Sequence, residues 1–229
     1  MSSVEFRVFA TPAEVAEAAA EGFFAAARNA VAAHGQFVVA LSGGRTPHMA
    51  YHLLRTAPVP WSQTHVFWGD DRAVPQDDPA SNAGEARRAL LDDMDGVTIH
   101  PMDCVALDLD AAARDAEAEL RAVAGGPVPV LDLVWLGMGA DGHTASLFPD
   151  SPALTETERL VVATTAPDGA ARLTMTYPLL NAARQVTFLV TGADKAVALA
   201  GVQAGDPTLP ATAIGAAQVT WLLDAATAR

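Results

Sequence analysis

Cysteine and lysine are nearly absent from this chain of 229 residues, which contains one of each, Cys104 and Lys195. A single cysteine cannot form a disulfide within the chain, so a disulfide-stabilised fold is excluded and a reducing compartment is compatible. Basic residues are scarce, because 14 Lys and Arg stand against 27 Asp and Glu, giving a net charge of −13. Nucleic-acid binders neutralise phosphates with a basic surface, so we expect no nucleic-acid partner.

Long apolar runs are also missing. The longest charge-free segment near the C-terminus, residues 207–223, is interrupted by two prolines, by Gln218 and by several threonines, which excludes a membrane span there. Residues 1–11 carry Glu5 and Arg7 and lack the basic start and apolar centre of a signal peptide. We therefore expect a cytoplasmic protein without a membrane partner.

The chain is 51% hydrophobic and 18% charged, a composition that fits one well-buried core, and we expect a single domain over residues 1–229. Apolar segments predict strands at 37–41, 65–68, 97–100, 130–136, 160–164, 186–191 and 221–223. Helices are predicted at 12–34, 47–56, 81–91 and 108–124, with one more after Lys195. This alternation predicts an α/β fold with a mostly parallel sheet and helices on both faces.

Four polar loops, beginning at Ser42, Asp70, Gly137 and Gly192, each follow a predicted strand. Ligands of open parallel sheets bind beyond the carboxyl ends of the strands, so we expect these loops to meet at one edge of the sheet.

The loop at residues 137–149 holds the most informative residues. Three glycines allow close approach of the backbone to a ligand, and Asp141 and His143 bring a carboxylate next to a base that titrates near neutral pH. The glycines also spell G-x-G-x-x-G, but Pro149 leaves no room for the helix that a dinucleotide site requires. Neither a nucleotide-hydrolase phosphate loop nor a G-x-S-x-G nucleophile motif is present in the sequence.

The segment at residues 42–47 reads Ser-Gly-Gly-Arg-Thr-Pro and joins a predicted strand to a helix. Its amides, hydroxyls and guanidinium favour binding of a phosphate or another small anion, and the alternative is a plain glycine turn capped by Thr46. Lys195 stands at the start of a predicted helix, where a cation is poorly placed unless an anion binds beside it. The alternative for Lys195 is an exposed surface side chain.

The charged segment at residues 70–72 either lines a site or forms a solvated loop. A metal site built from its acids with Asp141, His143 and His65 is conceivable, but no recognised ligand spacing is present, and we expect no metal. The remaining histidines are expected to be structural or exposed and without polar partners: His34, His48, His52 and His100.

Together these residues resemble the 6-phosphogluconolactonase family, whose members carry S-G-G-[SR]-T-P, then D-E-R-x-V-P followed by S-N, then G-x-G-x-D-G-H-T-A-S-L-F-P. The chain matches these motifs at 42–47, at 70–75 with Ser81-Asn82, and at 137–149. Further matches are 172–174, 178–181 and 192–195. One position departs from the pattern, since Asp71 stands where the family usually has glutamate and reaches one methylene less far.

The resemblance implies hydrolysis of 6-phosphoglucono-1,5-lactone to 6-phosphogluconate in the oxidative pentose phosphate pathway, without a cofactor. It also implies the fold of glucosamine-6-phosphate deaminases and ribose-5-phosphate isomerases. In this interpretation His143 is the general base on water, and Asp141 orients the imidazole or stabilises its protonated form. Arg72 stabilises the oxyanion or fixes the substrate. The expected substrate-binding residues are Ser42, Gly43, Gly44, Arg45, Thr46, Asp70, Asp71, Gly139, Arg172 and Lys195.

Two other functions are alternatives. Glucosamine-6-phosphate deaminases resemble the chain at Asp70 and 137–143 but carry a catalytic glutamate soon after the histidine, whereas residues 144–149 contain no acid. A non-catalytic sugar-phosphate sensor would retain 42–47 and Lys195 without needing His143 beside Asp141. The intact pair favours an enzyme.

Overall fold

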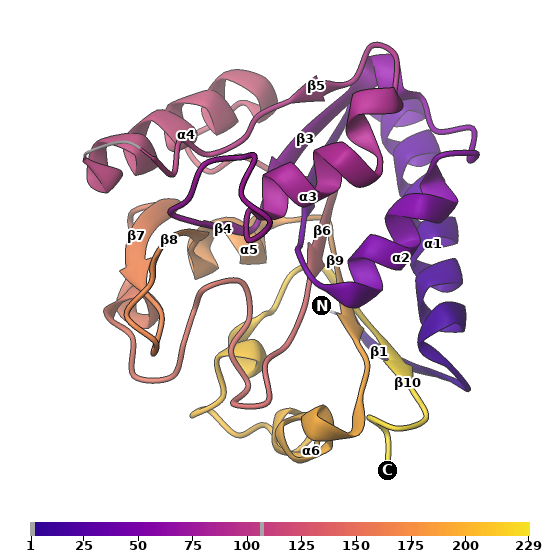
Figure 1. The fold of residues 1–229 in the computed structure, drawn as a ribbon, viewed down its shortest axis with the longest axis vertical. Coiled ribbons are helices and arrows are strands. Elements are labelled where there is room, and N and C mark those ends of the chain that lie inside the picture. The colour runs from indigo at the N-terminus through magenta and orange to yellow at the C-terminus, as the bar shows by residue number, and fades with distance from the viewer. Residues whose placement is uncertain (1–2, 106–107) are drawn as a thin grey trace.

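The computed structural model describes residues 3–105 and 108–229, and its strands form two sheets (Figure 1). The strands are β1 Ser3–Phe9, β2 Phe37–Leu41, β3 Thr64–Trp68, β4 Asp70–Arg72, β5 Thr98–Ile99, β6 Leu133–Leu136, β7 Val161–Thr165, β8 Ala171–Met175, β9 Gln185–Val190 and β10 Gln218–Asp224. The helices are α1 Pro12–His34, α2 Arg45–Leu54, α3 Asn82–Ala89, α4 Leu109–Ala124, α5 Tyr177–Ala182 and α6 Ala196–Gln203.

The larger sheet has seven parallel strands in the order β1-β10-β9-β6-β2-β3-β5, and the smaller has three antiparallel strands in the order β4-β8-β7. Buried side chains form two clusters, one on each face of the larger sheet. Helices α1, α2 and α3 pack against one face, while α4, α5, α6 and the small sheet pack against the other. The predicted α/β architecture with helices on both faces is therefore confirmed.

Local sequence explains where the first elements begin and end. The hydroxyl of Thr11 accepts a hydrogen bond from the N–H of Glu14 at 3.3 Å, Pro12 opens α1, and Gly35 ends it with φ of 86°. All five residues of β2 are buried, because the strand lies between β6 and β3 and feeds side chains into both clusters. No helix in the described ranges is long and apolar enough to cross a bilayer.

Four elements differ from expectation: β1, β4, β8 and α5 were not predicted. Residues 70–72 form strand β4 rather than a polar loop, because they pair antiparallel with residues 172–174 of β8. Charged residues are uncommon in strands, so residues 70–72 can be recognised as a strand only together with their partner strand β8. The sequence Pro167-Asp168-Gly169 is typical of a tight turn, and it is the local signal from which the hairpin β7–β8 could be predicted.

Two histidines expected to lack polar partners have them. His34 Nε2 lies 2.9 Å from Oδ1 of the buried Asp132, and His100 Nδ1 lies 2.6 Å from Oε1 of Glu119. His100 Nε2 is also 3.0 Å from Nδ1 of His65. The expectation was wrong for His34 and His100 because their partners are distant in sequence and are brought close only by folding.

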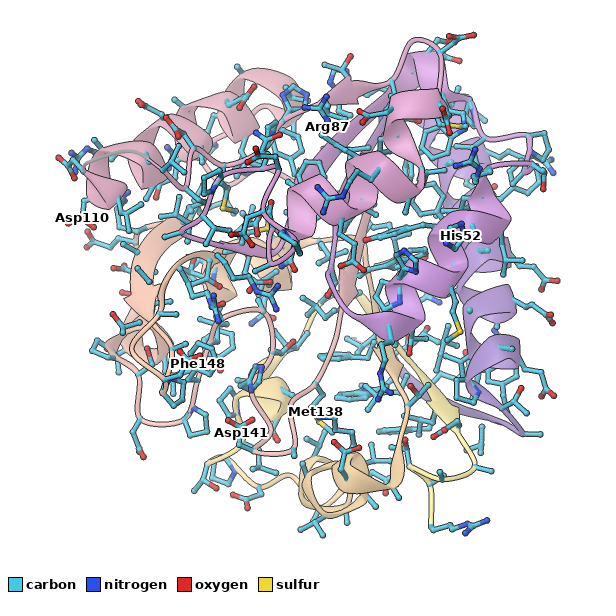
Figure 2. The ribbon with its side chains drawn as sticks, in the orientation of Figure 1. His52, Arg87, Asp110, Met138, Asp141 and Phe148 are labelled. Atoms are coloured by element: carbon cyan, nitrogen blue, oxygen red, sulfur yellow. The ribbon has the colours of Figure 1, made fainter. Side chains whose placement is uncertain are left out.

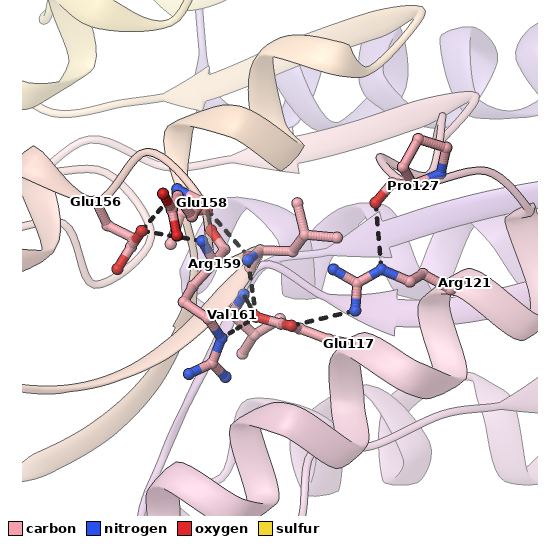
Figure 3. A network of polar contacts seen from close by, with 9 residues as sticks. Glu117, Arg121, Pro127, Glu156, Glu158, Arg159 and Val161 are labelled. Atoms are coloured by element: carbon pink, nitrogen blue, oxygen red, sulfur yellow. Dashed lines mark hydrogen bonds and ion pairs between the residues drawn. The ribbon is translucent and has the colours of Figure 1, made fainter.

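A buried carboxylate on α4 attaches this helix to the start of β7 (Figure 3). Glu117 is 5% exposed, and its Oε1 accepts hydrogen bonds from Arg159 Nε at 2.7 Å and from the N–H groups of Leu160 and Val161 at 2.8 and 3.1 Å. Arg121 Nη1 donates to Oε2 at 3.2 Å. Burial opposes ionisation, but these donors hold the pKa of Glu117 below its ordinary value. The contact therefore anchors the hairpin β7–β8.

We expect Glu117→Gln to lower the free energy of unfolding by about 2–4 kcal/mol, because it leaves Arg159 without its buried anionic partner. Because the folded pKa is depressed, the stabilisation is present above 4.5, the ordinary value, and is lost as the pH falls below it. Urea unfolding at several pH values measures this difference. Asp115→Asn, an exposed change on the same helix, is the matched control; equal effects of the two substitutions would contradict the assignment.

Candidate active site

A cavity of about 590 Å³ lies where the loops after β2, β6 and β9 meet strand β4, the start of α3 and the hairpin β7–β8. All four predicted polar segments reach this cavity. Three of them contribute their first residues, Ser42, Asp70 and Gly137, and the segment after β9 contributes Lys195. Ten of the predicted site residues line this cavity: Ser42, Gly43, Gly44, Asp70, Arg72, Gly139, Asp141, His143, Arg172 and Lys195.

The loop after β6 holds His143 and Asp141 together in this cavity. Oδ1 of Asp141 lies 2.6 Å from His143 Nδ1 and accepts a hydrogen bond from the backbone N–H of His143 at 3.1 Å. Partial burial opposes ionisation of Asp141, but the hydrogen bonds and the charge of the imidazole hold its pKa below the ordinary value. An ionised Asp141 places the ring proton on Nδ1, which leaves Nε2 free to accept a proton.

Two neighbours limit how the imidazole can lie. The ring of Phe148 has its centroid 4.7 Å from that of His143 at an interplanar angle of 47°. On another side, a Cβ on Gly139 would overlap both His143 Nδ1 and Oδ1 of Asp141. Figure 2 shows Met138, Asp141 and Phe148 close together in the loop after β6, with His52 apart from them on α2. The loop thus presents one orientation of the dyad.

Three cations line the same cavity. Arg72 on β4 and Arg172 on β8 are direct cross-strand partners, so two guanidinium groups project from adjacent positions of the small sheet. Like charges placed opposite each other destabilise a strand pair unless an anion neutralises them. Lys195 Nζ lies 3.0 Å from Oδ2 of Asp194 and adds a third positive group. The arrangement suits a phosphate or carboxylate ligand.

A second carboxyl group in the cavity has the opposite pKa behaviour. Burial raises the pKa of Asp70, although the hydrogen bond from Ser146 and the charges of Arg72 and Arg172 act in the other direction. Ser146 Oγ donates to Oδ2 of Asp70 at 2.5 Å, and Asn82 Nδ2 donates to the carbonyl of Asp70 at 3.0 Å. Environments that push two carboxyl pKa values apart are typical of catalytic sites.

Comparison with known proteins shows the family to which the chain belongs. The model of the family described as glucosamine-6-phosphate isomerases/6-phosphogluconolactonase matches residues 10–222. The chain therefore belongs to this family. A 6-phosphogluconolactonase of Synechocystis sp. is 47% identical to it over 204 residues, which cover 85% of each chain. The resemblance inferred from the sequence motifs is confirmed.

Solved structures of the family share the fold over the whole chain. A 6-phosphogluconolactonase from Trypanosoma cruzi superposes with a TM-score of 0.90 and 31% identity, covering 100% of this chain and 97% of that one. A monomeric glucosamine-6-phosphate deaminase reaches a TM-score of 0.82 at 21% identity, covering 98% of both chains. The expected fold relationship to the deaminases of this family is therefore confirmed, and the second comparison concerns the fold alone.

Three predicted site residues do not line the cavity. Asp71 is 3% exposed and turns toward α3, where its carboxylate accepts the N–H groups of Asn82 at 2.7 Å and Ala83 at 3.0 Å and the hydroxyl of Ser81 at 3.1 Å. The hydroxyl of Thr46 lies 2.8 Å from that of Thr191.

Arg45 lines a neighbouring cavity, together with His48 and Glu85. Arg45 and Thr46 lie outside the cavity that holds His143 because α2 begins at Arg45, so both belong to its first turn, whereas residues 42–44 form the loop between β2 and α2 that lines that cavity.

The cavity also contains residues that the sequence reasoning missed. They are Asn82, Gly137, Met138, Ala145, Ser146, Phe148, Ala166, Pro167 and Asp168. Several of them lie within the matched motifs, where the motif itself was the available signal. Residues 166–168 belong to the unpredicted hairpin. His65, once a candidate metal ligand, contacts His100 instead, and the described parts of the chain contain no group of three or more metal-ligating side chains arranged to hold an ion.

Substitution of Gly139 tests whether the absence of a side chain at this position is needed to hold His143 and Asp141 in place. We expect Gly139→Ala to lower the turnover rate by about 100-fold, because the added methyl displaces His143 and Asp141 from their working positions. Gly215→Ala, at a loop glycine with nothing within 4 Å of the added Cβ, is the matched control. A steady-state rate near that of the unsubstituted protein would refute this role for Gly139.

Substitution of Asp71 distinguishes support of α3 from chemistry. Asp71→Asn should lower the free energy of unfolding by about 1–3 kcal/mol, since one carboxylate oxygen loses its ability to accept hydrogen bonds. Asp71→Glu keeps the charge and should cost less. Thermal unfolding and turnover are measured together, with the exposed Asp77→Asn as control. A lost turnover rate at unchanged stability would show that Asp71 acts on the substrate after all.

Proposed function

We propose that this protein hydrolyses 6-phosphoglucono-1,5-lactone to 6-phosphogluconate, the reaction of the oxidative pentose phosphate pathway for which its relatives are named. One observation carries the proposal: a single cavity holds an Asp–His pair and three cations, Arg72, Arg172 and Lys195. Hydrolysis of a phosphorylated lactone needs the Asp–His pair to activate the water that attacks the ester carbonyl. It needs the cations to bind the phosphate at the other end of the substrate.

In the proposed mechanism, Nε2 of His143 removes a proton from a water molecule that attacks the lactone carbonyl carbon. Asp141, an ionised carboxylate, holds the Nδ1 proton and stabilises the imidazolium that forms. The tetrahedral intermediate then collapses, the bond from the carbonyl carbon to the ring oxygen breaks, and the imidazolium returns the proton to that oxygen. The acid released loses its proton to solvent at neutral pH.

The cations divide into two tasks. Arg72 stabilises the negative charge that develops on the carbonyl oxygen or fixes the substrate beside it, and Arg172 and Lys195 hold the phosphate together with the amides of 42–44. Binding of the phosphate relieves the repulsion between Arg72 and Arg172. The buried carboxyl of Asp70, held by Ser146, is placed to bind a sugar hydroxyl.

The proposal includes no metal or cofactor, because the Asp–His pair and the cations supply a base and charge stabilisation. It places the reaction in the cytoplasm, which suits a chain whose single cysteine, Cys104, is a buried free thiol. A deaminase activity is less well supported, since that reaction calls for a further acid soon after His143 and residues 144–149 contain none. The net charge of −13 continues to disfavour nucleic acid as a partner.

The test generates the lactone in situ from glucose 6-phosphate and compares its hydrolysis with the spontaneous reaction, with and without chelator. We expect acceleration that chelator does not change, and a rate reduced at least ~100-fold in His143→Ala. His52→Ala, which removes an exposed histidine on α2 away from the cavity, is the matched control.

Different results would reject the lactonase function and the role of His143. Absence of acceleration with verified substrate would reject the lactonase function, and ammonia release from glucosamine 6-phosphate would replace it with the deaminase reaction. An unaffected rate in His143→Ala would reject only the role of the histidine.

A further inference from the structure

Strand β1 forms one margin of the large sheet, and β10 is its single neighbour in the described ranges (Figure 1). Its exposed side chains include three apolar ones, since Val4, Phe6 and Val8 are 56%, 38% and 56% exposed. A long edge strand with exposed apolar residues is a template for pairing with another strand, and proteins usually protect such edges.

The backbone of β1 shows which residues are available for pairing. The N–H of Ser3 donates to the carbonyl of Ala217 at 3.1 Å, so the polar groups of Ser3 point toward β10. Successive residues of a strand direct their N–H and C=O to opposite sides. The backbone N–H and C=O groups of Val4, Phe6 and Val8 therefore point away from β10, toward the open edge of the sheet.

We propose that two copies of this chain associate by pairing their β1 strands antiparallel, about a two-fold axis at Phe6. In this register Phe6 faces Phe6 of the second copy, and Val4 faces Val8. These are the residues with outward backbone groups, so each of the pairs exchanges two hydrogen bonds across the interface. A two-fold axis of this kind joins the same patch on both copies and closes the assembly at a dimer.

The charges on β1 select this register. Glu5 lies opposite Arg7 of the second copy, and Arg7 lies opposite its Glu5, at the positions where side chains of antiparallel strands approach most closely. An axis at Glu5 would place two Glu5 carboxylates opposite each other, and an axis at Arg7 would oppose two guanidinium groups. The pairing about Phe6 is thus the one in which apolar meets apolar and acid meets base throughout.

This surface is separate from the catalytic cavity, which β1 does not line. Substitutions on β1 therefore leave the cavity intact, and the far-UV circular dichroism spectrum and thermal unfolding of each variant check that it is folded. The proposal stands or falls independently of the proposed function.

Sedimentation velocity over protein concentrations from about 1 to about 500 µM measures the association. We expect a concentration-dependent dimer that is weakened about tenfold or more by Arg7→Glu, or by Glu5→Arg, since each substitution opposes like charges twice. Mixing the two single variants should restore a dimer, now of unlike chains, and the double variant should dimerise alone.

The matched control is Arg28→Glu. Arg28 lies over the ring of Phe24 at 5.4 Å, much as Arg7 lies over that of Phe9 at 5.3 Å, so the same charge change and the same lost ring contact occur away from β1. A wild-type protein that stays monomeric throughout the range would overturn the proposal. A dimer that Arg7→Glu does not weaken, or that the mixed variants do not restore, would overturn it as well.

Discussion

Gly69 joins the two sheets, and the geometry of the site depends on it. Its N–H donates to the carbonyl of Leu41 on β2 at 3.0 Å, while its carbonyl accepts from the N–H of Met175 on β8 at 2.8 Å. One residue between β3 and β4 thus belongs to the hydrogen bonding of both sheets. The chain leaves the parallel sheet there and enters the antiparallel one, which brings β4 and β8 beside the loops at the carboxyl ends of β2 and β6.

The same junction explains how an acidic protein can present a local cluster of positive charge. The net charge of −13 repels a phosphate at long range, so the attraction must be local. Pairing of β4 with β8 supplies it by placing Arg72 opposite Arg172, a contact that is unfavourable while the cavity holds no anion. In the proposed function a bound phosphate neutralises this pair, and Glu117 supports the arrangement by fixing the hairpin that carries Arg172.

Sequence reasoning succeeded where the chemistry is local and failed where it depends on distant partners. Asp141 and His143 are two residues apart within one glycine-rich loop, so their contact could be predicted from spacing. Strand β4 could not, because three charged residues form a strand only in the presence of β8, about a hundred residues away. The same holds for Asp132, whose partners His34 and Arg184 come from elements on both sides of it in sequence.

The structure explains what the aspartate at position 71, in place of the family's usual glutamate, contacts, which could not be inferred from the motif. Side chains alternate along a strand, so Asp70 and Arg72 share the face of β4 that lines the cavity, while Asp71 faces the opposite way toward α3.

A change of one methylene at Asp71 therefore alters how β4 holds the start of α3. Its effect on the cavity passes through two residues that contact Asp71 and line the cavity: Asn82, and Arg72, whose N–H donates to Oδ1 of Asp71 at 2.8 Å. In the proposed function, Asp70 and Arg72 face the ligand, whereas Asp71 supports the fold.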